Sequence, residues 1–384
     1  HQFCEMGIAI VPEGRRLFTQ MSVFDNLELG SFIPKAKVHR KKSLDWVLSL
    51  FPALEVKLNS MAGSLSGGQQ QMLAIGRGLM AEPRLLILDE PTAVLTPQET
   101  DELMAIMKQL RDAGTAIVFI THKLREVKEV ADKITVIRLG KIVGEASPKS
   151  TANELASMMV GRAVDLDVEK GAPKLGETTF KISGLSSWNH AGTKVLDDIN
   201  LEIREGEILV IAGVQGNGQT ELTEAIIGMH GRTSGSIELD GKQLIGKNVK
   251  QVLDLGVGFV PEDRTEDGLV AEFTIAENLM LDRSDRKPFA KGMNIDLNFL
   301  KKFAQEKLKQ YDVRAQGIES KASQLSGGNQ QKVVLARELS RELRLLVASQ
   351  PTRGLDVGSI EFVHEQIVAA RDSGIPVLIV ATEL

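Results

Sequence analysis

The feature that most constrains this chain is an internal repeat with a very long period. Residues 65–71 read LSGGQQQ and residues 325–331 read LSGGNQQ, which is an offset of 260 residues. Further upstream, residues 7–13 (GIAIVPE) and 256–262 (GVGFVPE) match at an offset of 249. Solenoid and propeller repeats have periods of about 20–50 residues. A period five times longer predicts two tandem domains built on one plan, with loops of unequal length between the shared segments.

Length and local composition place the domain boundaries. The 384 residues suit two domains of ordinary size. Residues 163–177 (AVDLDVEKGAPKLGE) lose apolar periodicity and gather glycine, proline and charge, which favours a linker. We expect a first module in residues 1–162 and a second in residues 178–384. Apolar, strand-like runs lie close to both ends of the chain, so we expect both modules to be incomplete.

Helix and strand patterns alternate along the chain. Residues 85–88 and 117–120 are uninterrupted apolar runs, typical of strands in a parallel sheet that is covered on both faces. Between them, residues 97–111 carry apolar side chains at helical spacing. A strand, a helix and a strand in this order form a right-handed crossover unit. The sequence therefore predicts an α/β fold with a mainly parallel sheet.

Composition and charge exclude several classes of function. The 46 basic and 51 acidic residues give a net charge of −5, and aromatic residues make up 4% of the chain, so we expect no nucleic-acid partner. The single cysteine, Cys4, excludes an internal disulfide and a cysteine-based zinc site. No apolar run approaches the roughly 18 residues of a membrane span. Any role at a membrane must therefore come through a partner.

A glycine-rich loop follows a predicted strand in the second module. Residues 208–212 are apolar, residues 213–220 read GVQGNGQT, and a helical pattern follows. Such loops present backbone N–H groups to phosphate oxygens at a helix N-terminus. Gln219 stands at the lysine position and brings no positive charge; a turn without a ligand is the alternative. With the Thr220 hydroxyl as a ligand of Mg²⁺, the expected nucleotide-binding residues are Gly213, Gln215, Gly216, Asn217, Gly218, Gln219, Thr220 and Glu221.

Two acids end an apolar strand in the first module. Asp89 and Glu90 follow residues 85–88, and ligands of parallel α/β sheets gather at the carboxyl ends of the strands. We expect Asp89 to hold Mg²⁺ through its water shell and Glu90 to orient the attacking water. A solvated turn or a helix cap is the alternative. At the offset of 260 the second module has Ser349 and Gln350, and neither can act as a carboxylate base.

His122 follows the apolar run 117–120 and is a candidate to stabilise charge on a terminal phosphate. A structural histidine at a strand end is the alternative. Its counterpart in the second module is Thr382, so that module lacks the lysine, both acids and the histidine. Four losses in one copy favour a single functional asymmetry, with one competent and one degenerate site.

Each copy of the LSGG sequence opens a predicted helix. A serine hydroxyl and two glycine N–H groups at a helix start form an end that attracts anions. A plain N-cap would explain one copy, but it explains two copies poorly. The candidate nucleotide-binding residues at these turns are Ser66, Gly67, Gly68 and Gln69 in the first module, and Ser326, Gly327, Gly328 and Asn329 in the second.

These motifs resemble those of one family. LSGGQQQ, LSGGNQQ, LLILDEP (residues 85–91) and THKL (residues 121–124) are typical of the ATP-binding subunits of ABC transporters. In the second half, GVQGNGQTEL, VPEDR and SQPTRGLDVG resemble bacterial importers of nucleosides and simple sugars, which pair one active with one degenerate module. Residues 1 to about 88 are more similar to the ATPases of branched-chain amino acid importers. We take a join near Asp89, natural or from sequence assembly, as a hypothesis.

The resemblance implies tandem P-loop NTPase modules with a helical subdomain, acting on ATP with Mg²⁺. It implies that each nucleotide lies between one module's phosphate loop and the other module's signature, and it places the first phosphate loop upstream of residue 1. Glu13 and Glu262 fall where the family often has the Q-loop glutamine. The implied motifs are Walker A at Gly213–Thr220, Walker B at Leu85–Asp89, the signatures at Leu65–Gln69 and Leu325–Asn329, the catalytic Glu90 and the switch His122.

The resemblance also implies partners. An integral membrane permease would receive the motion driven by ATP hydrolysis, an extracytoplasmic solute-binding protein would act indirectly, and this chain would lie on the cytoplasmic face of the plasma membrane. The alternatives are a soluble tandem ABC ATPase acting on ribosomes or DNA, a branched-chain amino acid importer ATPase, and a regulatory scaffold. Candidate permease contacts, for which core packing is the alternative, are Phe24, Leu27, Leu29, Phe273, Ile275 and Leu279.

Overall fold

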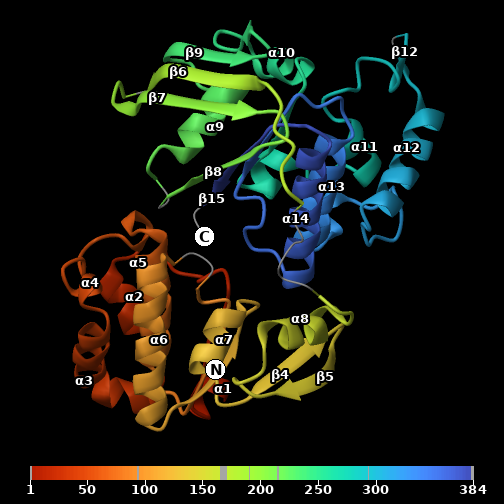
Figure 1. Cartoon of the computed structure of the whole chain (residues 1–384). Helices are drawn as coiled ribbons and strands as arrows, with labels where there is room; N and C mark the ends of the chain where they lie inside the picture. Colours follow the sequence, from red (N-terminus) through yellow and green to blue (C-terminus); the bar gives the residue numbers. More distant parts are fainter. Residues whose placement is uncertain are drawn as a thin grey trace. The chain divides into compact units, whose positions relative to one another are not determined.

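The computed structural model describes residues 2–92, 95–164, 171–189, 191–213, 216–292 and 294–381. The chain divides into two compact units, His1–Val164 and Asp165–Leu384 (Figure 1). Residues 165–170 of the predicted linker lie outside the described residues, so the predicted module boundaries stay predictions.

The first unit is built around a three-stranded parallel sheet. β1 (Ile8–Val11) pairs with β2 (Leu85–Asp89), and β2 pairs with β3 (Ala116–Ile120). The strands predicted at 85–88 and 117–120 and the helix predicted at 97–111 are confirmed to within one residue. The remaining elements are α1 (Gln2–Glu5), α2 (Val23–Gly30), α3 (Pro34–Leu50), α4 (Pro52–Glu55), α5 (Gly67–Leu79), α6 (Pro97–Asp112), α7 (Leu124–Val130), β4 (Ile134–Arg138), β5 (Lys141–Ala146) and α8 (Ala152–Val160).

Local sequence explains where the helices of the first unit begin. Thr96 caps α6 in a capping box with Glu99, and Pro97 occupies the first helical position, where its missing N–H costs nothing. The helical subdomain, α2 to α4, packs on α5 through buried Leu27, Val47 and Leu54. β4 and β5 form an antiparallel hairpin against α8 (Figure 1).

The second unit repeats this plan and adds layers. Its parallel sheet has the order β11 (Val257–Val260), β14 (Leu345–Ser349), β15 (Val377–Ala381) and β8 (Ile208–Ala212). The other elements are β6 (Thr178–Trp188), β7 (Lys194–Arg204), α9 (Gln219–Ile227), β9 (Thr233–Leu239), β10 (Lys242–Gln243), α10 (Val249–Asp254), a π-helical turn (Arg264–Gly268), α11 (Ile275–Met280), β12 (Ala290–Lys291), β13 (Asn294–Ile295), α12 (Leu297–Gln310), α13 (Gly327–Leu339) and α14 (Val357–Asp372), with 3₁₀ turns at Ala62–Ser64 in the first unit and Ala322–Gln324 in the second.

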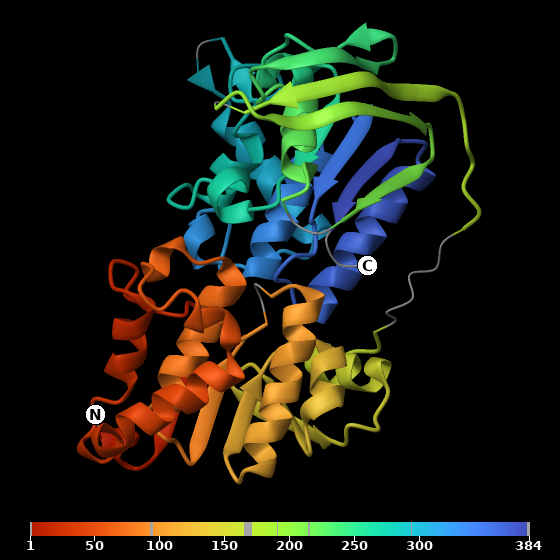
Figure 2. The ribbon, with the colours of Figure 1, turned by 90° about the vertical axis from the view of Figure 1, so that its left-hand side faces the viewer.

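Helices and a second sheet cover the parallel sheet of the second unit on both faces. An antiparallel sheet, in the order β10, β9, β6, β7, packs over α9, which in turn packs on the parallel strands (Figure 2). α13 and α14 cover the other face together with the helical subdomain of α11 and α12. The predicted α/β fold with a parallel core is therefore confirmed.

The sheet of the first unit departs from the prediction that both of its faces are covered. Ile10, Val118 and Ile120 lie on one face with exposed fractions of 63%, 45% and 48%. At the matching positions of the second unit, Leu378 and Val380 are buried, because β8 pairs with β15 and α9 packs above. Among the described residues the first unit has no counterpart of β8 or α9. An apolar pattern predicts which residues tend to be buried, but it does not supply the elements that bury them.

Candidate functional site

The first candidate site lies where β2 ends. Asp89 is the last residue of β2, and Glu90 follows with a left-handed φ of 45°, held by its N–H donating to the Ile120 carbonyl at 2.9 Å. A non-glycine residue in this conformation costs about 1–3 kcal/mol and is typical of functional turns. The Asp89 backbone pairs with Ile120 in the sheet. Its side chain makes no hydrogen bond or ion pair within the described part of the chain, so its carboxylate is available to a ligand.

Glu90 and His122 form a pair. The Nδ1 atom of His122 lies 2.8 Å from Oε1 of Glu90, and the Thr121 hydroxyl donates to Oε2 at 3.4 Å. Both side chains of the pair are largely buried. The hydrogen bond of the His122 ring to the Glu90 carboxylate raises the pKa of His122, although burial opposes the shift. The structure thus brings together two of the predicted catalytic residues from the ends of neighbouring strands.

Sequence reasoning missed a group of hydrogen bonds beside this pair. The hydroxyl of buried Thr92 donates to Oε2 of Glu126 at 2.7 Å, and Nζ of Lys123 donates to the Thr92 carbonyl at 3.3 Å. Burial raises the pKa of Glu126. These contacts tie the turn after Glu90 to the helix after His122. The only signal in the sequence was an acid within the short helix α7, which is too common a feature to predict a site.

The same slot in the second unit keeps its backbone and loses its charge. Gln350 has a φ of 44°, and its N–H donates to the Val380 carbonyl at 2.7 Å, as Glu90 does at the matching position. Ser349, in place of Asp89, is only 2% exposed. Thr382, in place of His122, lies outside the described residues. The turn at Gln350 therefore keeps the left-handed conformation, but neither Gln350 nor Ser349 supplies a carboxylate.

The glycine-rich loop of the second unit joins β8 to α9. Gly216 and Gly218 have φ values of 90° and 98°, which favour glycine, and α9 begins at Gln219. Oε1 of Gln219 accepts a hydrogen bond from the Asn217 N–H at 3.0 Å, and a Cβ on Gly213 would lie 2.7 Å from its Nε2. The amide side chain is therefore folded over the loop. Gln215, another predicted ligand, lies outside the described residues.

Thr220 and Glu221 occupy the first turn of α9. The Thr220 hydroxyl donates to Oε2 of Glu262 at 3.4 Å, and Oε1 of Glu262 forms an ion pair with Arg353. The structure therefore joins the phosphate loop to the residue predicted at the Q-loop position. It also adds Arg353, which sequence reasoning did not single out.

The two LSGG turns share a frame and differ in detail. Ser66 and Gln69 form a capping box at the start of α5, whereas Ser326 makes no side-chain cap to the backbone of α13. Asn329 instead donates to the Ser326 hydroxyl at 2.9 Å and accepts from the Arg314 N–H at 2.8 Å. Both helices begin at the first glycine of the motif, at Gly67 and Gly327.

A side chain at the second glycine of each LSGG turn would have to displace a neighbouring polar side chain. A Cβ on Gly68 would lie 2.3 Å from a Glu99 oxygen, and one on Gly328 would lie 2.1 Å from the Ser359 hydroxyl. Gly67 and Gly327, which precede them, sit at the same helix starts. Close packing therefore accounts for part of the LSGG pattern, while the anion-binding role of these residues stays a prediction.

Some predicted contacts are wrong. Leu27, Ile275 and Leu279 are buried in the cores of their units, where packing rather than a partner explains them. Phe24, Leu29 and Phe273 are exposed and remain predicted permease contacts. No helix in the described ranges is both long and apolar enough to cross a membrane.

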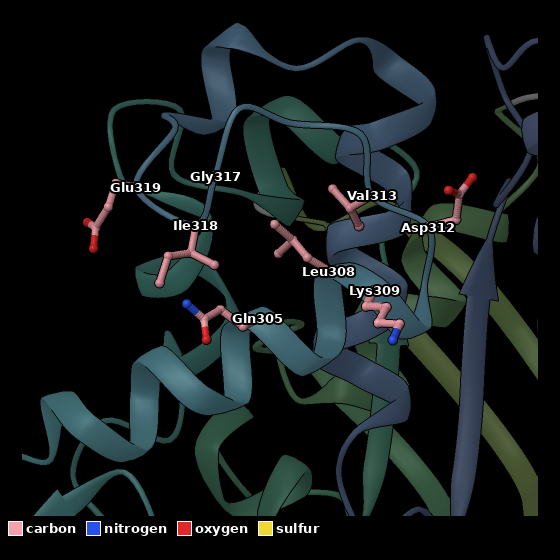
Figure 3. Close-up of a pocket in the computed structure, with 8 residues that line it drawn as sticks. All are labelled: Gln305, Leu308, Lys309, Asp312, Val313, Gly317, Ile318 and Glu319. Carbon is pink, nitrogen blue, oxygen red and sulfur yellow. The ribbon is translucent and has the colours of Figure 1, made fainter.

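A pocket of about 570 Å³ lies in the second unit between α12 and the loop that follows it (Figure 3). Leu308 and Ile318 give it an apolar wall, with Gln305, Lys309 and Glu319 at its rim. None of the predicted site residues lines it. The candidate sites are instead the strand ends and helix starts described above.

Mg²⁺ prefers carboxylate oxygens together with its own water, and the two units differ in their fit to it. Asp89 offers an unpaired carboxylate at a strand end, which suits the ion. In the second unit the acid position is Ser349, and Glu262 already carries a counter-ion. No group of three or more possible metal ligands occurs in the part of the chain that the structure describes. Asp89 therefore fits as a water-mediated ligand. The Thr220 hydroxyl donates to Glu262, and its role as a ligand of Mg²⁺ stays a prediction.

Comparisons with known proteins agree with these features. A family model described as ABC transporter matches residues 1–93 and 196–353. The nucleoside import ATP-binding protein NupA of Lactococcus lactis is 42% identical over 385 residues, covering 99% of this chain and 76% of that protein. The guanosine import ATP-binding protein NupO of Bacillus subtilis is 40% identical, covering 99% of this chain and 75% of that protein. A solved structure of an RNase-L inhibitor matches with a TM-score of 0.65 at 20% identity, covering 97% of this chain and 68% of that one, which shows a shared fold.

Proposed function

The chain belongs to the ABC transporter family of ATP-binding proteins, and on that premise we propose that it is the subunit that hydrolyses ATP to drive import of a nucleoside. Two relatives that cover 99% of this chain are named for nucleoside and guanosine import, and others are named for glucose, ribose and xylose import. Nucleoside is therefore favoured over a simple sugar. The alignments to the first two relatives run through both sides of Asp89, which favours this substrate over a branched-chain amino acid; the join near Asp89 stays a hypothesis.

The observation that carries the proposal is the Glu90–His122 pair beside Asp89. Glu90 follows the central strand of a parallel sheet, in a strained turn that fixes its direction. Its carboxylate is anchored on one side by His122 and Thr121. A carboxylate held in this way can accept a hydrogen bond from water and orient it for attack on a phosphate. We assign this role to Glu90.

Asp89 is the proposed residue that holds Mg²⁺. When bound, the ion would neutralise charge on the transferred phosphate. Because Nδ1 of His122 faces Glu90, Nε2 is the ring atom that His122 has for a terminal phosphate. The raised pKa of His122 favours the imidazolium, which can donate from both ring nitrogens. His122 would therefore hold the phosphate end while Glu90 holds the water.

The second unit is the proposed degenerate site, which binds nucleotide without efficient turnover. Its loop offers backbone N–H groups from the described part of Gly213–Thr220, and α9 directs its N-terminus at the same place. Glu221 lies in the first turn of that helix. Gln350 and Ser349 replace the two acids, so neither position carries a carboxylate that could activate water. The LSGG turns, Ser66–Gln69 and Ser326–Asn329, are the remaining proposed nucleotide contacts.

A membrane permease is the proposed partner, since the relatives are named as the ATP-binding parts of import systems. We place the chain at the cytoplasmic face of the membrane, with an extracytoplasmic solute-binding protein acting through the permease. Exposed Phe24, Leu29 and Phe273, in the helical subdomains, are the proposed contacts. Phe24→Ser and Phe273→Ser should weaken retention of the permease, whereas Val38→Ser, at an exposed position on α3, should leave it unchanged.

The proposal is tested by purifying the full-length protein with its permease and reconstituting both into vesicles. We expect the permease to copurify, and a nucleoside presented with the solute-binding protein to stimulate ATP hydrolysis several-fold. Ribose, xylose and leucine serve as matched solutes. Stimulation by leucine would instead support the branched-chain amino acid alternative. Sedimentation with ribosomes and no retained permease would support the soluble alternative.

A further inference from the structure

We propose that the second unit replaces the divalent cation of its nucleotide site with the guanidinium of Arg353, so that a nucleoside triphosphate binds there without Mg²⁺. The inference rests on the proposed function, because it assumes that this site takes a nucleotide. It accounts for two sequence motifs, VPEDR and PTRG, that the catalytic asymmetry leaves without a role.

The first step is the state of Glu262. Its side chain is only 16% exposed, contacts the Thr220 hydroxyl through Oε2, and pairs with Arg353 through Oε1. The negative charge that reaches the phosphate-loop threonine is therefore neutralised by a residue of the protein itself. With Ser349 at the strand end, the pair leaves no net negative charge to attract a dication at these positions.

The second step is the way in which Arg353 is held. An exposed ion pair contributes little by itself, and the Arg353 side chain is 42% exposed. Its backbone, however, is fixed on both sides: the Arg353 N–H donates to the Gln350 carbonyl at 3.0 Å, and Nη1 of Arg264 donates to the Arg353 carbonyl at 2.8 Å. The guanidinium is thus aimed at Glu262 by a turn and by a second arginine.

The third step is the placement of Arg264. Asp263 accepts hydrogen bonds from the Thr265 N–H at 2.8 Å, the Thr265 hydroxyl at 2.6 Å and the Glu266 N–H at 3.1 Å, which starts the π-helical turn. Those bonds lower the pKa of Asp263, so it stays ionised. Arg264 then lies against the LSGG turn, where a Cβ on Gly327 would be 2.5 Å from its Nη2. We regard Arg264 as a positioning residue for Arg353.

The fourth step is the contrast with the first unit. At the offset of 249, Glu13 matches Glu262 and Arg15 matches Arg264; Nη1 of Arg15 donates to the Gly67 carbonyl at 3.3 Å. At the offset of 260, the position of Arg353 is Ala93, which cannot supply a cation. The unit that keeps Asp89 and Glu90 thus lacks the arginine at this position. The unit that has the arginine lacks both acids.

The chemistry of a guanidinium suits it to replace a divalent cation beside phosphate oxygens. It has five N–H donors in one plane, of which the Nη1 group meets Glu262, and it binds phosphate oxygens without being deprotonated. Because Glu262 offsets its charge, Arg353 contributes to the loop through the N–H donors that do not meet Glu262. Those donors can bind phosphate oxygens at a place where, within the described residues, no unpaired acid attracts a dication.

The test is equilibrium binding of ATP to the full-length protein in MgCl₂ and in EDTA. For the wild type we expect two bound ATP molecules in MgCl₂ and one in EDTA, because only the site at Asp89 needs the ion. Photolabelling with azido-ATP in EDTA should modify the peptide that contains residues 213–221. Arg353→Ala should weaken binding in EDTA by at least about tenfold, as expected for loss of a charge-assisted contact.

Two further variants separate this role from general effects. The control Arg286→Ala removes an arginine from another partly exposed ion pair of the same unit, with Asp254, and should bind ATP in EDTA as the wild type does. Glu262→Gln keeps the guanidinium and removes the carboxylate that offsets its charge, so ATP should bind in EDTA at least as tightly as to the wild type; a loss as large as that of Arg353→Ala would overturn the inference. Thermal unfolding of each variant establishes that it is folded.

The outcomes are distinguishable. Wild-type binding of two ATP molecules in MgCl₂ and none in EDTA would overturn the inference and leave the proposed function in place. Equal binding by Arg353→Ala and the wild type in EDTA would overturn it as well. No binding of ATP in either buffer would contradict both the inference and the proposed function.

Discussion

The two units share one turn geometry and carry different side chains on it. Glu90 and Gln350 share a left-handed φ and the same hydrogen bond to the neighbouring strand. One turn presents a carboxylate that meets His122, and the other presents an amide next to buried Ser349. In the proposed function, a few side chains at these matching positions separate a hydrolytic site from a binding site on the same strand–turn backbone.

A second contrast concerns the sheets. β15 is paired on both sides and lies under α9, whereas β3 is paired with β2 alone within the described residues and carries exposed apolar side chains on one face. Similar apolar sequences thus have very different surroundings. Burial is a property of what packs on a strand as much as of the strand itself.

The contrast in catalysis is tested first, since it predicts the largest effect. Glu90→Gln in the full-length protein should lower ATP hydrolysis about 10²–10⁴-fold, because it removes the group proposed to orient water. Gln350→Ala, at the same backbone slot, should change the rate less than about threefold. Steady-state phosphate release measures both. Equal losses in the two variants would mean that the units are not catalytically different.

The contrast in packing predicts the next largest effect. Leu378→Ala in β15 should reduce the free energy of unfolding by about 2–5 kcal/mol, since Leu378 is fully buried. Val118→Ala, at the matching position of β3, should cost less than about 1 kcal/mol because that side chain is already exposed to water. Urea unfolding of this 384-residue chain measures both values. A large loss in Val118→Ala would show that this face is covered in solution.

The Glu90–His122 pair predicts a dependence on pH. Glu90 raises the pKa of His122 in the folded state, so the pair should stabilise the fold fully below the ordinary pKa of histidine and lose that contribution as the pH rises through the raised value. NMR titration should give a lower pKa for His122 in Glu90→Gln than in the wild type. The matched variant Glu126→Gln should lower the pKa of His122 by less, because Glu126 acts on His122 more weakly than Glu90 does. An unchanged pKa in Glu90→Gln would contradict the pairing.

The two LSGG turns predict the smallest effect. Ser66→Ala removes a capping box and should cost about 1 kcal/mol of stability. Ser326→Ala should cost less than about 0.5 kcal/mol, because Ser326 accepts from Asn329 rather than capping α13. Urea unfolding again measures both. A larger loss in Ser326→Ala would reverse the order that the hydrogen bonds predict.

The sequence by itself determined the fold class, the repeat and the asymmetry. Strand and helix patterns depend on local spacing, so the strands at 85–88 and 117–120 and the helix at 97–111 are readable from neighbouring residues. The differences between the units at Asp89, Glu90 and His122 are differences of residue type, and an internal repeat makes them visible without a structure.

Tertiary structure alone decided which distant groups meet. The ion pair of Glu262 with Arg353 joins residues 91 positions apart, and Thr92 with Glu126 joins residues 34 apart. It also decided that Leu27 and Ile275 are core residues, while Ile10 and Val118 are exposed. Local pattern fixes what a residue can do, because propensity and polarity act over a few residues. Contact and burial depend on how the whole unit packs, and neighbouring residues in the sequence do not specify the distances between residues far apart along the chain.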